Sequence, residues 1–131
     1  MMEKRYYEWS LLLLRLTLGI IFLAHGWQKI NGFEQVAKFF ASLGLPGFLI
    51  YFVVTIETLG GLFLLLGIFT RLAAAGIAAV MVGAIATVKA QAGLVGGYEF
   101  ELTLLIGAVA LALSGSELFS VQTLWKKNRQ N

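Results

Sequence analysis

RLTLGIIFLAHGWQKINGF, residues 15–33, places strongly polar side chains inside a run that is otherwise apolar enough to cross a bilayer. On one face of a helix, within an arc of roughly 100°, would lie Arg15, Phe22, His25, Gly26 and Lys29. An ionisable group at membrane depth costs at least ~2.5 kcal/mol on insertion scales, so such groups usually face partners or trapped water. We therefore expect this helix to line a site inside the protein.

The composition of the whole chain is that of a membrane protein. Of its 131 residues, 59% are hydrophobic and 13% are charged, and the mean hydropathy is +0.83. These values are too apolar for an ordinary soluble domain of this size. The chain has no composition break and no linker, so we expect residues 1–131 to form a single membrane domain.

The residue inventory excludes several kinds of site. The chain contains no cysteine, no aspartate and one histidine. A Cys-ligated metal, bis-His haem ligation, a Ser-His-Asp triad and an HExxH zinc site are therefore excluded within one chain, and we expect no metal site. The net charge of +3 does not indicate nucleic-acid binding, because the basic residues flank apolar segments and form no stripe with interleaved aromatic residues.

Four apolar runs predict an all-α membrane protein, a bundle of four transmembrane helices. The expected helices cover about residues 10–30, 48–69, 71–92 and 99–116. Between the first two, at about residues 34–44, the apolar side chains gather on one face. This pattern predicts a short amphipathic helix at the membrane interface, and a soluble loop helix is the alternative.

The basic residues predict the orientation in the membrane, since an even number of spans places both termini on one side. That side would carry Lys4, Arg5, Arg71, Lys126, Lys127 and Arg129. The opposite side would carry only Lys29, Lys38 and Lys89. By the positive-inside rule, we expect a multi-pass protein of the plasma membrane with both termini in the cytoplasm.

Glu57, near the centre of the second span, is the most informative residue. We expect it to be protonated or matched by a base on another helix, and the candidates for that base are His25, Arg15 and Lys89. Glu57 would then handle protons or hold a ligand, or else form a structural ion pair that fixes helix register. His25, at a similar depth, would relay protons or bind a quinone carbonyl, or make an interhelical hydrogen bond.

The remaining polar candidates have two interpretations each. Arg15, nearer the cytoplasmic side, would hold an anion or Glu57, or extend to the headgroups. Lys29, Lys89 and Glu101 fall near the outer ends of their helices, where they would join the site; for Lys89 and Glu101 the alternative is an anchor at the interface. The expected ligand-binding or proton-handling set is Glu57, His25, Arg15, Lys29, Lys89 and Glu101, with no catalytic residue assigned.

Small residues recur every four positions along the third span. They are Ala75, Ala79, Gly83 and Thr87. Such a flat stripe should let another helix approach closely, and it would allow a homodimer if it is not used inside the bundle.

Three stretches of the chain resemble the DoxX family of small four-helix membrane proteins. The first is Arg15-x3-Gly19-x2-Phe22-x2-His25-Gly26-x-Gln28-Lys29-x2-Gly32-Phe33. The second is Glu57-x2-Gly60-Gly61 with Gly67-x2-Thr70-Arg71-x-Ala73-Ala74. The third is Tyr98 to Leu102, where Glu101 matches the acidic residue that opens the last helix of the family. The chain departs from the family in its ending, GSELFSVQTLWKK, where a Gly-Pro-Gly-Arg-like turn would be expected.

The resemblance implies an oxidoreductase-linked membrane protein. Members of the family resemble the membrane subunit of thiosulfate:quinone oxidoreductase, and others are associated with resistance to catechols, quinones and oxidative stress. We therefore expect a subunit that holds a quinone against His25 and Glu57 for a soluble redox partner and is not catalytic alone. The alternatives are a small transporter of aromatic or sulfur compounds, with Glu57 as its proton-coupled carboxylate, and a membrane scaffold for soluble redox enzymes.

Overall fold

The chain folds into a bundle of helices. The structure is a computed structural model that describes residues 2–130, except for the side chains of Met2, Lys89 and Ala90. Within that range, the helical segments long and apolar enough to cross a membrane are Glu3–Asn31, Phe48–Leu66, Thr70–Val88 and Leu94–Ser114. The expected all-α fold with four transmembrane helices is therefore confirmed.

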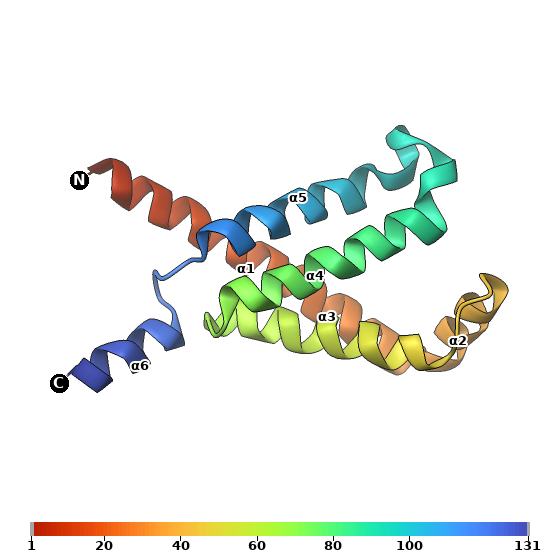
Figure 1. Ribbon diagram of the computed structural model, residues 1–131, viewed down its shortest axis with the longest axis horizontal. Helices are drawn as coiled ribbons and strands as arrows, with labels where there is room; N and C mark the ends of the chain where they lie inside the picture. Colours follow the sequence, from red (N-terminus) through yellow and green to blue (C-terminus); the bar gives the residue numbers. More distant parts are fainter. Residues whose placement is uncertain (1, 131) are drawn as a thin grey trace.

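The four long helices follow one another in chain order, and each runs antiparallel to the one before it (Figure 1). They are α1 (Met2–Asn31), α3 (Phe48–Leu66), α4 (Thr70–Ala84) and α5 (Glu99–Ser114). The connection from α4 to α5 contains a π-helical turn, η1 (Ile85–Lys89), a 3-10 turn, η2 (Ala90–Ala92), and a kinked segment, η3 (Leu94–Tyr98), in which Val95 and Gly96 are not helical. Two shorter helices are α2 (Phe33–Ser42), between the first two spans, and α6 (Val121–Gln130), after the last. Whether α2 lies at a membrane interface stays a prediction.

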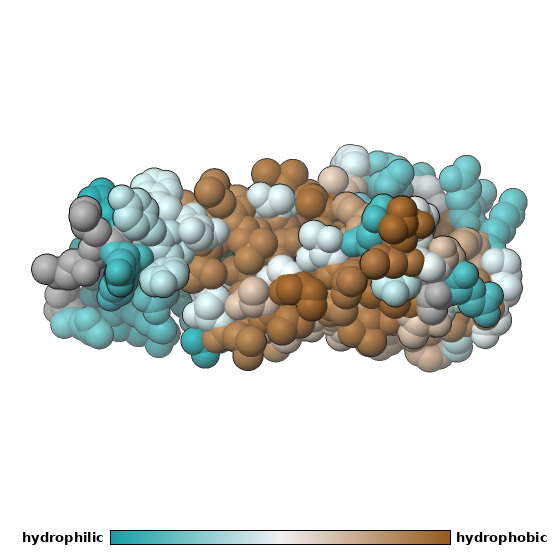
Figure 2. Space-filling view, turned by 90° about the horizontal axis from the view of Figure 1, so that it is seen from above, coloured by the Kyte–Doolittle hydropathy of each residue, from teal (hydrophilic) through white to brown (hydrophobic). Residues whose placement is uncertain are grey.

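An apolar belt covers the middle of the bundle. On the face drawn in Figure 2, hydrophobic side chains lie across the middle of the molecule and hydrophilic ones toward its two ends. The start of α1 and the whole of α6 lie at one end, called here the terminal end, whereas α2 and the connection from α4 to α5 lie at the other, the loop end (Figure 1). An apolar belt between polar ends is the surface that a bilayer requires, so the chain is a multi-pass membrane protein.

Helices α1 and α3 approach closely because glycines face each other where they cross. A methyl group on Gly61 would lie 2.5 Å from the Leu23 nitrogen and 2.8 Å from the Gly19 oxygen. One added at Gly26 would collide with the Thr58 hydroxyl. Since lipid tails are as apolar as leucine, such close packing of backbones is a main source of helix association in a membrane.

The small-residue stripe of α4 is exposed at the surface of the bundle. The face of α4 that enters the core consists of Ala73, Ala74, Ile77 and Met81. The expected stripe is exposed at Ala75, Ala79 and Gly83 of α4 and at Thr87 of η1, and its last three members line a cavity. The small side chains therefore leave space there, and the homodimer stays a prediction.

Candidate functional site

An ion pair between α1 and α3 is the centre of the candidate site. The Lys29 Nζ atom donates to both carboxylate oxygens of Glu57, at 2.7 Å and 3.0 Å. The Glu57 side chain is 3% exposed and that of Lys29 is 25% exposed. Glu57 is therefore matched by a base on another helix, as expected, but that base is Lys29 and neither of the described candidates, His25 and Arg15. Helical side chains lean toward the N-terminus of their helix, so Lys29, near the end of α1, extends back into the bundle.

His25 lies one turn before Lys29, between two aromatic rings. Its ring centroid is 6.1 Å from that of Phe22 and 6.2 Å from that of Phe100, whose plane is inclined by only 25°. His25 is partly buried, and it makes no hydrogen bond within the described part of the chain. The interhelical hydrogen bond considered from the sequence is thus not formed there, and His25 lines a cavity instead.

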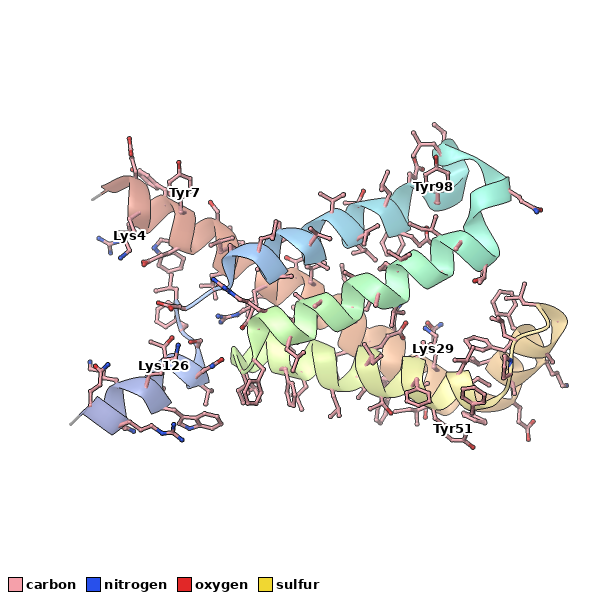
Figure 3. The ribbon with its side chains drawn as sticks, viewed as in Figure 1. Lys4, Tyr7, Lys29, Tyr51, Tyr98 and Lys126 are labelled. Atoms are coloured by element: carbon pink, nitrogen blue, oxygen red, sulfur yellow. The ribbon has the colours of Figure 1, made fainter. Side chains whose placement is uncertain are left out.

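These groups line a cavity of about 520 Å³, called here the Glu57 cavity. Most of its lining is apolar and comes from α2, α3, α4 and α5, including Phe40, Phe52, Met81, Phe100 and Leu104. Polar side chains enter it from four elements, as His25, Lys29, Glu57, Thr87 and Glu101. Figure 3 shows the labelled Lys29 side chain between α3 and α4. An apolar cavity of this size with a few convergent polar groups is typical of small-molecule sites.

Arg15 belongs to the opposite end of the bundle. It is fully buried, with 0% exposure. Its Nη1 atom donates to the Ser116 carbonyl at 3.0 Å, and its Nη2 atom donates to the Phe119 carbonyl at 3.0 Å. Arg15 is about 15 Å along α1 from His25, at ~1.5 Å per residue. It therefore neither holds Glu57 nor extends to the headgroups; it anchors the segment between α5 and α6.

The structure thus brings together four of the six residues expected in the site. Around the Glu57 cavity lie Glu57, His25, Lys29 and Glu101. Arg15 lies elsewhere, and the Lys89 side chain falls outside the described residues. Their roles in binding stay predictions. Groups of three or more acidic or histidine side chains that could hold a metal ion do not occur among the residues described.

Phe100 is one of the lining residues that were not expected from the sequence. It lies beside Glu101 at the start of α5 and stacks on His25. The available signal was its position within the Tyr98–Leu102 stretch, one residue before a carboxylate already singled out. The partners of Arg15 had no such signal, because backbone carbonyls of Ser116 and Phe119 leave no pattern in a sequence.

Comparison with known proteins agrees with this architecture. The family model described as DoxX matches residues 10–90. "Putative oxidoreductase CatD" of Bacillus subtilis (strain 168) is 39% identical over 128 residues, which cover 98% of this chain and 96% of that protein. "Inner membrane protein YqjF" of Escherichia coli (strain K12) is 34% identical over 68 residues, 52% of each chain.

A third relative is "Uncharacterized membrane protein Rv3486" of Mycobacterium tuberculosis (strain ATCC 25618 / H37Rv). It is 30% identical over 128 residues, which cover 86% of this chain and 78% of that protein. No solved structure matches the chain.

Proposed function

This chain belongs to the DoxX family of membrane proteins, and we propose that it binds a quinone or a related aromatic compound, such as a catechol, in the Glu57 cavity. It would do so as the membrane subunit of an oxidoreductase or of a system that resists redox stress. The observation that carries the proposal is the Lys29–Glu57 ion pair, which faces an apolar cavity beside the unbonded ring of His25. The name of the Bacillus relative, a putative oxidoreductase, supports the same class.

The lining supplies what a planar ring with two oxygen atoms requires. Phe100 and His25, whose near-parallel ring centroids are 6.2 Å apart, form an aromatic surface against which a ligand ring can pack. The Lys29 ammonium can donate a hydrogen bond to a carbonyl oxygen, and the Glu57 carboxylate can accept one from a hydroxyl group. One pair of residues can therefore bind both the oxidised and the reduced form of the ligand.

Reduction of a quinone to a quinol takes up two electrons and two protons. Glu57 and His25 can receive or release protons beside the ligand. The chain has no cysteine, and ordinary carboxylate, imidazole and ammonium groups do not carry electrons. The electrons would come from a soluble redox partner with its own flavin, metal or thiol, so the purified chain alone should show no turnover.

Binding is favoured over transport by the packing next to the cavity. Leu18, Phe22 and Leu64 are 3%, 0% and 0% exposed and belong to the same core cluster. They fill the bundle between the Glu57 cavity and the terminal end, where Arg15 closes the interior. A transported compound would have to displace this core, whereas a bound one would not.

Calorimetry with a water-soluble, short-chain quinone analogue and the detergent-purified full chain tests the proposal. Saturable binding is expected for the unaltered protein. The Lys29→Gln/Glu57→Gln double variant removes both charges together and should fold, yet lose at least about tenfold in affinity, which corresponds to about 1.4 kcal/mol. Equal binding by the two proteins would overturn the proposal and make the pair a structural element only. Arg129→Gln, an exposed charge of α6, is the control.

A further inference from the structure

A second cavity, of about 500 Å³, lies at the terminal end of the bundle, where α4 begins and α5 leads into α6. We call it the Arg71 cavity. In contrast to the Glu57 cavity it has a mainly polar lining, which includes Arg71, Lys126, Glu117, Thr70, Ser116 and Ser120. None of these residues belongs to the quinone site proposed above, so the two cavities differ in chemistry.

The Thr70 hydroxyl is a hydrogen-bonding group on the wall of this cavity. Thr70 lines it and is only 6% exposed, but its side chain makes no hydrogen bond with the described residues. The hydroxyls of its neighbours differ: that of Ser116 accepts from Arg15, and that of Ser120 binds Thr123. Because buried polar side chains almost always have partners, the Thr70 hydroxyl is expected to bind a group that enters the cavity.

The charges around the cavity favour an anion. Arg71 and Lys126 carry positive charge and Glu117 negative charge, so the lining is positive in sum. Arg71 uses one donor weakly, from Nη2 to the Ser114 carbonyl at 3.4 Å, and its other donors are free within the described residues. The buried guanidinium of Arg15 lies directly behind Ser116 and adds to the positive potential.

The start of α4 adds backbone donors at the same place. α4 is 15 residues long, and its N-cap, Phe69, provides no side-chain cap. The amides of Thr70 and Arg71 in the first turn have no intrahelical acceptor, and the positive end of the helix dipole favours a bound anion. An arginine, a lysine, a hydroxyl and first-turn amides together match the several oxygens of a phosphate group.

We propose that the Arg71 cavity binds a phosphate group, which a phospholipid headgroup or free phosphate can supply. The surroundings favour the lipid. Exposed apolar side chains lie next to the cavity. Phe69 and Leu72 line it, and Phe119 lies in the segment between α5 and α6; each is exposed by half or more. Figure 2 shows the hydrophobic belt giving way to hydrophilic side chains toward this end. A headgroup in the cavity would place its acyl chains along Leu72 and the belt.

Native mass spectrometry of the detergent-purified full chain tests the proposal. The probes are phosphatidylglycerol and phosphatidylcholine with identical acyl chains. Removing both cations, as Arg71→Gln/Lys126→Gln, should weaken retention of phosphatidylglycerol at least about tenfold, which is about 1.4 kcal/mol. The matched control, Arg5→Gln/Arg129→Gln, removes the same charge from the same end outside the cavity and should retain the lipid within about twofold of the unaltered chain. Equal loss in the two pairs would overturn the proposal.

A second arm distinguishes the two sources of phosphate. If inorganic phosphate raises the melting temperature of the unaltered chain and of the control pair, but not of the cavity pair, free phosphate is the ligand. If inorganic phosphate has no such effect, but phosphatidylglycerol is retained by the unaltered chain and the control pair and lost by the cavity pair, the ligand is a lipid. If neither probe does, the cavity binds no phosphate and the proposal is wrong.

Two further variants cover a failure of the cavity pair to fold. Thr70→Val keeps the shape of the side chain and removes its hydroxyl, so it should lower phosphatidylglycerol retention several-fold while the circular dichroism spectrum stays unchanged. Arg71→Lys keeps the charge and should bind better than Arg71→Gln. Unchanged retention in Thr70→Val together with equal retention in the two Arg71 variants would refute the site. Neither result depends on whether a quinone binds at the other end.

Discussion

The Lys29 ammonium lies 2.7 Å from one carboxylate oxygen of Glu57 and joins α1 to α3 inside the apolar belt. The two residues differ in burial, since Glu57 is 3% exposed and Lys29 is 25% exposed. The Lys29 ammonium is therefore partly exposed, whereas the buried Glu57 carboxylate depends on Lys29 to compensate its charge. Loss of Lys29 should therefore affect Glu57 before any other residue.

Removal of Lys29 alone should cause Glu57 to take up a proton, because an unpaired carboxylate in a low-dielectric interior neutralises itself. Infrared difference spectroscopy should show a protonated carboxyl band in Lys29→Met. That band should be absent from the unaltered chain and from Lys29→Met/Glu57→Gln, which identifies its source. The single variant should also lose about 3 kcal/mol of stability, and the double variant less. A band that persists in the double variant would assign the proton to another carboxyl group.

A larger side chain at Gly83 should occupy part of the Glu57 cavity without harming the fold. A Cβ atom at Gly83 would meet nothing within 4 Å, and the residue lines the cavity. Gly83→Leu should therefore abolish binding of a quinone analogue while leaving the thermal midpoint unchanged or slightly raised, since glycine in a helix costs up to about 1 kcal/mol. Ala75→Leu, exposed on the same helix outside the cavity, should bind normally. Undiminished binding by Gly83→Leu would place the ligand elsewhere.

Gly61→Ala should separate α1 from α3. Its added methyl group would approach the Leu23 nitrogen and the Gly19 oxygen, which are backbone atoms and cannot turn aside. Overpacking of this kind costs about 1–3 kcal/mol. Reversible unfolding in mixed micelles measures the loss, and Gly83→Ala on α4 is a helical glycine control that should lose nothing. A Gly61→Ala protein as stable as the control would show that the close crossing is dispensable.

Arg15→Gln should release the segment between α5 and α6. The guanidinium holds the Ser116 and Phe119 carbonyls from two different nitrogens, and hydrogen bonds from charged donors contribute about 1.5–3 kcal/mol each. Hydrogen–deuterium exchange should accelerate across residues 115–123, while α3 keeps its protection. Lys4→Gln, at the exposed start of α1, should leave both segments unchanged. Uniform acceleration over all helices would mean that Arg15 supports the whole bundle.

The absence of cysteine allows the orientation to be measured directly. Single cysteines can be introduced as Ser42→Cys in α2 and Asn128→Cys in α6, which are both exposed and lie at opposite ends. If the positive-inside rule holds, a membrane-impermeant maleimide added outside intact cells should label residue 42 and not residue 128. The reverse labelling would invert the orientation, and equal labelling would mean that the chain inserts both ways.

The number and type of spans could be predicted from the sequence, because a long apolar run in a bilayer can satisfy its backbone hydrogen bonds only as a helix.

The site could be predicted only in part. The periodicity of α1 correctly placed His25 and Lys29 on one face, but it does not say which base reaches Glu57, since that depends on the crossing of α1 and α3 and on the direction in which Lys29 leans. Periodicity likewise did not reveal that Arg15 has main-chain partners, which carry no sequence signature.

The stripe of small residues on α4 is a second pattern whose role could not be predicted from the sequence. Its spacing is typical of a helix contact, yet Ala79 and Gly83 border the Glu57 cavity. A small side chain permits both a close helix and an empty space, and the arrangement of the other three helices decides between them. The spacing therefore predicted a flat helix face, but it did not predict whether a helix or a cavity lies against that face.

The anchoring of Arg15 also sets an order of events during synthesis. Arg15 and Ser116 are separated by 101 positions in the chain, so at roughly 5–20 residues per second the ribosome needs about 5–20 s to make the acceptor after the donor. The guanidinium of the first helix therefore has no partners from this segment until Ser116 and Phe119 have been made. A nascent chain that stops at residue 115 would contain every spanning helix, but its first helix would lack the acceptors that hold Arg15 in place.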